Sequence, residues 1–199
     1  LYLDSGALYR AITLYAMEHD MVLADGSIDT RSLVAALPDI DIHFEYAPEG
    51  SRTFIGDRCV EKEIRTIEVS SHVSPVAVIP EVRDFVDDIL VGYGKNKRIV
   101  MDGRDIGTAV FPHADLKIFM TANDNVRAER RLKEMRASGQ NPDFNEVLEN
   151  LKSRDYIDSH REKSPLRQAE DAVVLDNSDM TLEDQMVWVK NLVKEKFGE

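Results

Sequence analysis

The chain has 199 residues, of which 43% are hydrophobic, and its 37 acidic and 25 basic side chains give a formal net charge of −12. This composition predicts a globular protein with a proper core, and it argues against nucleic acid or an anionic membrane surface as partners, because both are bound through basic stripes. The single cysteine, Cys59, excludes an intramolecular disulfide and a thiolate metal cluster and favours the cytoplasm. Apolar runs are too short for a membrane span, and the histidines lack metal-ligand spacing, so neither a membrane segment nor a metal site is predicted.

Two helices are predicted at the start of the chain. Ser5 can cap a helix whose apolar positions run from Leu8 to Ala16 and which ends near His19. A second, short helix follows and stops at Pro38, which cannot continue the pattern.

A small β lobe is predicted next. Residues 40–44 alternate apolar and polar side chains, residues 53–55 resume the extended pattern, and the Pro-Glu-Gly sequence at 48–50 supplies a turn. Because this antiparallel hairpin interrupts an otherwise alternating helix and strand pattern, we interpret 39–66 as an inserted lobe that covers a site. Residues 1–38 are then the first part of the core.

The rest of the chain predicts the other part of an α/β core. Two helices are expected over 67–93, with breaks at Pro75 and Pro80. Further strands are expected at 99–101, 116–120 and 172–175, and further helices at 123–137, 144–161 and from 182 onward. The order is typical of a parallel sheet wrapped by helices, so residues 67–199 complete the core.

The run at 99–101 leads into the most informative stretch. It is short and apolar enough for a buried strand of a parallel sheet. Gly103 and Gly107 let the backbone turn tightly, while Arg104 and Asp105 present a guanidinium and a carboxylate at the carboxyl end of the strand, where open α/β sheets bind ligands. We predict a binding loop; the alternative is a surface turn with an ion pair.

Charged residues in the region 123–161 share helix faces. They form two groups, one of Arg127, Arg130 and Arg131, the other of Arg154, Asp158 and Arg161. A solvated, salt-bridged helix surface is the simple alternative. The break at 139–142, however, makes a helical hairpin that could close over a ligand as a lid, and closure would bring the arginines together.

Several motifs in the same order resemble bacterial cytidylate kinases. They are Leu-Asp-Ser-Gly-Ala-Leu-Tyr-Arg at 3–10, Glu-Ile-Arg-Thr at 63–66, the segment 74–83, Asp-Gly-Arg-Asp at 102–105, and the series Arg154, Asp158 and Arg161. The resemblance covers essentially the whole chain. It implies a P-loop kinase-like fold with a nucleoside monophosphate (NMP) lobe and a helical lid, and an enzyme that transfers the γ-phosphoryl group of ATP to CMP or dCMP with Mg²⁺.

The resemblance also implies roles for residues of the phosphate and sugar sites. Arg10, Arg104 and Arg161 would hold the CMP phosphate and the transferring group, with a hydroxyl contact from Ser5. Arginine suits this work, because its planar donors bind phosphate bidentately and it stays charged. Arg154 would lie near the sugar and the phosphates. A further contact, to the sugar hydroxyls, is implied for Asp158.

Base and ATP contacts are implied in the same way. Ser74, Arg83 and Asp105 resemble the residues that contact cytosine, and a carboxylate can accept from the exocyclic amine that cytosine has and uracil lacks. The residues expected to reach ATP are Arg127, Arg130 and Arg131. Surface ion pairs remain the alternative for these three.

The chain departs from the family in its phosphate-binding loop. The pattern G-x-x-x-x-G-K-[ST] is expected upstream of Leu3 and is absent, and the segment 92–96, which we interpret as a loop, does not replace it. We therefore expect roughly 25 to 30 further residues before Leu1 and a 199-residue polypeptide that is by itself inactive and poorly folded.

Alternatives from other classes stay open. They are a non-catalytic nucleotide-binding fragment and a related kinase acting on UMP or AMP, although Ser74, Arg83 and Asp105 together favour cytosine. The partners expected are small molecules. A monomer is expected, because no apolar stripe is left over for a partner.

Overall fold

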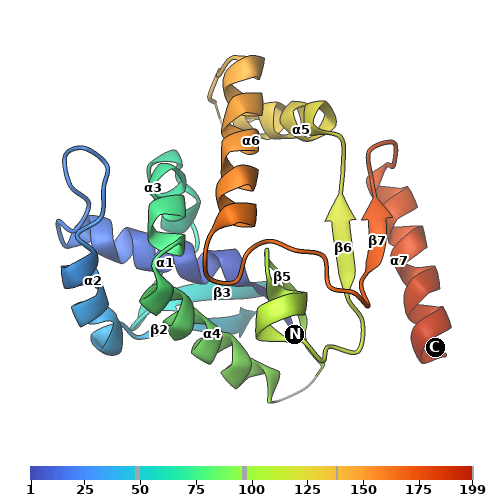
Figure 1. Cartoon of the computed structure of the whole chain (residues 1–199), viewed down its shortest axis with the longest axis horizontal. Coiled ribbons are helices and arrows are strands. Elements are labelled where there is room, and N and C mark those ends of the chain that lie inside the picture. Colours follow the sequence, from blue (N-terminus) through green and yellow to red (C-terminus); the bar gives the residue numbers. More distant parts are fainter. Residues whose placement is uncertain (48–49, 96–97, 138, 199) are drawn as a thin grey trace. The chain divides into compact units, whose positions relative to one another are not determined.

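A computed structural model of the chain describes residues 1–47, 50–95, 98–137 and 139–198 (Figure 1). It contains two units. The first comprises residues 1–111 and 161–165, and the second comprises residues 112–160 and 166–199. Both combine helices with a parallel pair of strands, and the first also holds a small antiparallel sheet, so the predicted α/β class is confirmed.

A parallel pair of strands places the binding loop in the first unit. β1 (Tyr2–Asp4) pairs in parallel with β5 (Val100–Asp102), with Asp4 opposite Asp102. The carboxyl ends of both strands, and the turns that follow them, are therefore adjacent. The prediction of a buried strand here is wrong, since Val100 is 67% exposed.

α1 (Ser5–Glu18) follows β1 without a loop and ends next to His19, as predicted. Ser5 does not cap it, because the N-cap position is taken by Asp4 and the Ser5 hydroxyl bonds elsewhere. The shorter α2 (Thr30–Ala36) is capped by Asp29, whose carboxylate accepts from the Ser32 amide at 3.1 Å, and the 3₁₀ turn η1 (Leu37–Asp39) follows it.

The predicted hairpin is confirmed, and a third strand that was not predicted pairs with it. β2 (Ile42–Ala47), β3 (Gly50–Ile55) and β4 (Arg58–Cys59) form an antiparallel sheet in that order. Ile42 lies opposite Ile55 in its register. Two residues of the predicted turn, Pro48 and Glu49, lie outside the described residues.

Helices α3 (Ile67–Ala77) and α4 (Pro80–Gly94) follow the 3₁₀ turn η2 (Glu63–Arg65). Pro80 is the first residue of α4, a position that proline favours. The predicted break at Pro75 is wrong, because Pro75 lies inside α3, two residues before its end. Its missing backbone N–H removes one helical hydrogen bond there without ending the helix.

The loop predicted at 92–96 is also wrong for its first three residues, because α4 extends to Gly94. A Cβ at Gly94 would lie 2.7 Å from Phe111 Cζ, so the glycine allows the end of α4 to pack against that ring. Asn96 lies outside the described residues.

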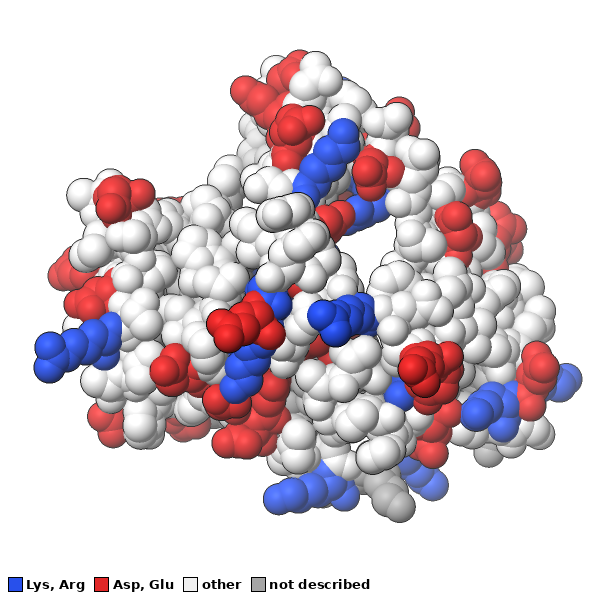
Figure 2. Space-filling view, in the orientation of Figure 1, with Lys and Arg blue, Asp and Glu red and all other residues white. Residues whose placement is uncertain are grey.

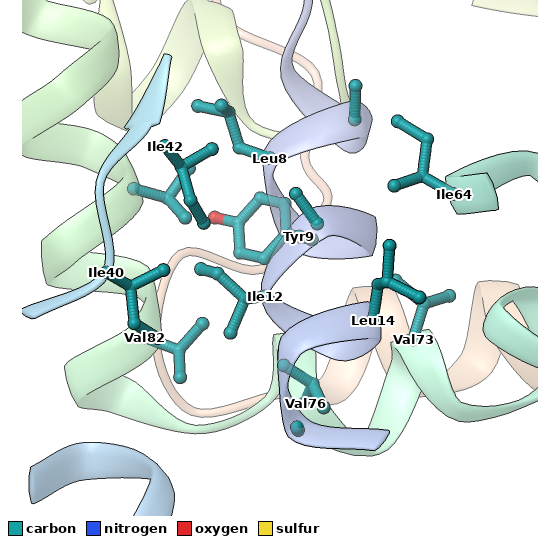
Figure 3. Packing of buried hydrophobic residues seen from close by; sticks show 14 of the residues in the cluster. Leu8, Tyr9, Ile12, Leu14, Ile40, Ile42, Ile64, Val73, Val76 and Val82 are labelled. Carbon is teal, nitrogen blue, oxygen red and sulfur yellow. The ribbon is translucent and has the colours of Figure 1, made fainter. Parts of the chain in front are cut away.

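α1 runs through the core of the first unit (Figure 3). Leu8, Ala11 and Ile12 are completely buried, and Figure 3 shows Tyr9 among aliphatic side chains from the neighbouring elements. Those neighbours include Val76 of α3 and Val82 of α4, both fully buried as well. The hydrophobic effect thus holds the helix that carries Ser5 and Arg10.

Two strands and two helices of the second unit confirm the elements predicted at these positions. β6 (Ile118–Thr121) pairs in parallel with β7 (Val173–Asp176), while α5 (Asp124–Ala137) and α6 (Phe144–His160) bury Ala128, Leu132 and Val147 between them.

α7 (Leu182–Phe197) begins with a capping box formed by Thr181 and Asp184. None of its described residues is buried, and Leu182 is 81% exposed, so the reason given above for expecting a monomer is wrong.

The described surface carries mixed charges. On the face in Figure 2 the coloured acidic and basic side chains are interspersed, without a continuous basic stripe among the residues it colours. In the described ranges no helix is both long and apolar enough to cross a membrane.

Candidate functional site

A buried cluster of charges lies in the first unit. Asp105 Oδ2 pairs with Arg83 Nη2, and Asp105 Oδ1 lies 3.4 Å from Arg161 Nη2. The three side chains are only 6%, 1% and 5% exposed, respectively. The structure thus brings together α4, the turn after β5 and the segment 161–165, and it places one carboxylate between two guanidiniums. The exposed surface turn offered as the alternative for Asp105 is wrong, because Asp105 is buried.

Arg83 is held on several sides. Its Nη1 donates to the carbonyl of Ala77 at 3.2 Å, and its guanidinium carbon lies 5.3 Å from the centroid of the Tyr9 ring, within cation–π range. Ser74, half-buried on α3, lies one turn before Ala77. Burial raises the pKa of Tyr9, so its hydroxyl stays protonated beside the charges.

Asp87 lies one turn after Arg83 on α4. Burial, and next the negative charge of Asp105, raise its pKa to about 6. Its Oδ1 is buried and has no hydrogen-bond partner among the described residues, and the same is true of Arg83 Nε. Asp87 is therefore a titratable group of the cluster that sequence reasoning missed.

The adjacent turns after β1 and β5 are joined by Ser5. Its hydroxyl donates to the carbonyl of Asp102 at 2.7 Å. A Cβ at Gly103 would overlap Ser5 Oγ and would lie 2.8 Å from Ile106 Cγ1, so the close approach requires a glycine there. The other glycine of this stretch, Gly107, lies within the π-helical turn η3 (Ile106–Val110), and the predicted role for it in a tight loop is wrong.

Two predicted phosphate ligands lie near this junction in the chain. Arg10, half-buried on α1, donates through Nη1 to Ser70 Oγ at 2.7 Å. Arg104 is half-buried in the turn that also carries Asp105. Both arginines thus belong to the same unit as the buried cluster.

Arg65, from the motif at 63–66, links the end of β1 to the β lobe. Its Nη2 lies 3.2 Å from Asp4 Oδ2 and 2.6 Å from Glu61 Oε1. The other oxygen of Glu61 accepts from the Thr53 hydroxyl at 3.0 Å. The motif arginine therefore connects the lobe with the strand that precedes the site.

The three predicted ATP ligands, in the second unit, all have polar neighbours. Arg127 binds Asp155 through two hydrogen bonds, one of them 3.1 Å long. Arg130 donates to the side-chain and backbone oxygens of Asn177 at 2.8 and 2.7 Å. Arg131 lies 3.3 Å from Glu134 and is 43% exposed. The structure thus ties Arg127 and Arg130 more firmly than Arg131.

Arg154 and Asp158 lie four residues apart on α6, both half-buried, in the second unit. Arg161, the third member of their predicted series, follows the end of α6 and belongs to the first unit. Its Nε and Nη2 both donate to the carbonyl of Ser164, at 2.8 and 2.6 Å.

A pocket of about 580 Å³ lies in the second unit between α5 and the start of α7. Its lining includes Arg130, Lys133, Met180 and Leu182. Arg130 is the single predicted site residue on this lining.

Comparison with known protein families gives a match over residues 1–195 to the family described as cytidylate kinase. The chain belongs to the cytidylate kinase family. Its α/β architecture, with parallel strand pairs and a small antiparallel sheet, is consistent with the P-loop kinase fold of that family.

Curated members of the cytidylate kinase family are similar over the whole chain. A cytidylate kinase of Bacteroides thetaiotaomicron is 50% identical over 200 aligned positions, which cover 100% of this chain and 85% of the relative. One from Parabacteroides distasonis is 53% identical, covering 99% and 86%, and one from Porphyromonas gingivalis is 47% identical, covering 100% and 87%.

Proposed function

We propose that the reaction is transfer of the γ-phosphoryl group of ATP to CMP or dCMP, giving ADP and CDP or dCDP, and that this chain supplies the residues named below. The observation that supports this most directly is the buried carboxylate of Asp105 between Arg83 and Arg161. Membership of the cytidylate kinase family supports the same reaction.

Asp105 suits the recognition of cytosine. An ionised carboxylate is a pure acceptor, so it can accept from the exocyclic amine of cytosine but meets the carbonyl of uracil with repulsion. The two guanidiniums fix the orientation of Asp105 before a substrate arrives. Arg83 would donate to the acceptor edge of the ring. We propose a base contact for Ser74 too, since it lies one turn before the carbonyl that Arg83 binds.

The phosphate of CMP would lie near the first turns of α1. Ser5 begins this helix, whose N-terminal amides favour an anion, and Arg10 follows on the same helix. We assign Arg10, Arg104 and Arg161 to the phosphate and the transferring group. Phosphoryl transfer requires mainly positioning and charge neutralisation, which these guanidiniums supply.

Contacts to the sugar and to ATP are assigned to the second unit. We propose that Asp158 accepts from the sugar hydroxyls and that Arg154 lies near the sugar and the phosphates. Of the predicted ATP ligands Arg127, Arg130 and Arg131, we favour Arg131, because it is exposed and its ion pair with Glu134 is a surface pair of low stability.

Mg²⁺ would accompany the nucleotide. Within the described ranges, no group of three or more His, Cys, Asp or Glu side chains is placed to hold a metal ion. Mg²⁺ commonly binds through substrate phosphates, waters and one or two carboxylates, and its charge would neutralise the ATP phosphates.

The test is a comparison of phosphate acceptors. With ATP and Mg²⁺, ADP release should be faster with CMP and dCMP than with UMP or AMP. Asp105→Asn should reduce the preference for CMP over UMP, because an amide can also donate to a carbonyl. Asp88→Asn, at an exposed position on α4, is the matched control and should retain the preference for CMP over UMP.

Other outcomes would identify the alternatives. Equal rates with UMP or AMP would point to a related kinase with another base preference. Binding of CMP without phosphoryl transfer would point to a non-catalytic nucleotide-binding module.

A further inference from the structure

Two unpartnered polar atoms lie one helical turn apart in the buried cluster. Asp87 Oδ1 and Arg83 Nε are both buried, and neither has a hydrogen-bond partner among the described residues. The other two nitrogens of Arg83 are engaged, Nη1 with Ala77 and Nη2 with Asp105. An acceptor and a donor of opposite charge at i and i+4 spacing on one helix are suitably placed to interact.

A purely structural role does not explain this carboxyl group. Burial of a carboxylate oxygen without a hydrogen bond opposes folding, and the neighbouring charge of Asp105 adds to the penalty. An apolar residue at position 87 would avoid both effects. Asp87 therefore has the features of a group that serves a site at the expense of stability.

The charges that face Asp87 come from several elements. On α4 they are Arg83 and Asp84, and from other segments they are Asp105 and Lys163. The Tyr9 hydroxyl is a neutral titratable group that Asp87 also influences. Arg83 and Lys163 favour the carboxylate form of Asp87, whereas Asp84 and Asp105 oppose it. Lys163 also pairs with Asp84, so its charge is shared between two carboxyl groups.

We propose that Asp87 is a positioning residue for base recognition: its carboxylate holds the Arg83 guanidinium over Tyr9 and against Asp105, and loss of its charge weakens binding of CMP. This inference rests on the proposed function, in which Arg83 and Asp105 contact the base. Asp87 acts through Arg83 and has no assigned contact with the substrate.

The charge of Asp87 should change within an accessible pH range. Its pKa is raised to about 6, so the carboxylate predominates at pH 7.5 and the neutral acid predominates at pH 5. Positioning of Arg83 should accordingly be complete at pH 7.5 and weakened at pH 5. This gives a signature that a shape-filling role for the side chain would lack.

The experiment is calorimetric titration of CMP into the protein from pH 5 to pH 8, for the wild type and Asp87→Asn. The phosphate of CMP itself titrates near pH 6, but it does so equally with both proteins, so the ratio of their dissociation constants is the readout. Because the substitution removes the attraction between the Asp87 and Arg83 charges, Asp87→Asn should bind about tenfold more weakly at pH 7.5. At pH 5 the ratio should fall to about one.

Two further variants separate charge from shape. Asp88→Asn, at the exposed neighbouring position, should follow the wild type at every pH. Asp87→Glu restores the charge and should recover most of the affinity at pH 7.5.

Each contrary outcome has a distinct meaning. A ratio near one at all pH values, or a ratio above one that does not change with pH, would overturn the positioning role. An Asp87→Asn chain that fails to fold at pH 7.5 would also overturn it, since the carboxylate would then be a structural requirement. Failure of the wild type to bind CMP at any pH would instead refute the proposed function on which the inference rests.

Discussion

Removal of the Asp105 carboxylate should be among the most destabilising changes in the first unit. Asp105 is the shared anion of Arg83 and Arg161, and the three side chains are at most 6% exposed. Asp105→Ala leaves the Arg83 charge buried without its carboxylate and removes one partner of Arg161. Loss of one partner of a buried ion pair typically costs 3 to 5 kcal/mol, so we expect the free energy of unfolding to fall by about 4 kcal/mol.

Arg83→Met should be milder. It removes a buried cation and keeps most of the apolar volume, while Asp105 retains Arg161 at 3.4 Å. We expect a loss of about 1 to 2 kcal/mol. In the double variant, methionine also removes the cation that Asp105→Ala leaves unpaired, so its loss should be smaller than the sum of the single losses by about 1 to 3 kcal/mol.

Urea unfolding at pH 7.5, followed by far-ultraviolet circular dichroism, measures these differences. Asp88→Asn is the control for a change of charge at an exposed position. The reasoning is refuted if Asp105→Ala costs no more than Arg83→Met, or if the two losses are simply additive.

Three further changes test other contacts. Gly103→Ala should lower the free energy of unfolding in urea by about 1 to 3 kcal/mol, because its Cβ would overlap Ser5 Oγ. Gly92→Ala, in open space on α4, should raise it by about 0.5 to 1 kcal/mol. Equal effects would contradict the close approach at Gly103. Because the folded-state pKa of Asp87 is raised to about 6, the folded chain binds that proton more tightly than the unfolded chain, and stability should fall as pH rises from about 4 to 6. Asp87→Asn should reduce this fall and be at least as stable as the wild type at pH 7.5; lower stability there would be the contrary result. Arg130→Ala should lower the free energy of unfolding by about 1 to 3 kcal/mol, since it leaves the 8% exposed Asn177 without two hydrogen bonds. Arg131→Ala should change it by no more than about 0.5 kcal/mol. Thermal melting would distinguish the two variants, and a reversed order of stability would contradict the contacts.

Regular patterns in the sequence predicted most of the elements. Amphipathic spacing located α1 and α4, and alternation located the antiparallel sheet, because both signals come from one buried face per element. Pro75 was misinterpreted for a physical reason: a proline near the end of a helix removes one hydrogen bond without ending the helix at once.

The site was predictable only in part. The motifs named Arg83, Asp105 and Arg161, and the structure brings these three together. Asp87 was missed, and Tyr9 was quoted only as part of the motif at 3–10, because the sequence does not reveal which side of a charged helix packs against a second carboxylate. The spacing of four between Arg83 and Asp87 was visible, but such pairs are usually solvated. The functional roles assigned to these residues remain predictions.

The hydrogen bond between Ser5 and Asp102 places a condition on the phosphate contact predicted for Ser5. A hydroxyl has one proton to donate, and Ser5 gives it to the carbonyl of Asp102. A dianionic phosphate offers only acceptors, so Ser5 can donate to it only after its hydroxyl rotates away from that carbonyl. Binding of the phosphate would then break the hydrogen bond between Ser5, the first residue of α1, and the turn that carries Arg104 and Asp105. Loss of this one hydrogen bond would couple occupancy of the phosphate position to the conformation of the base position.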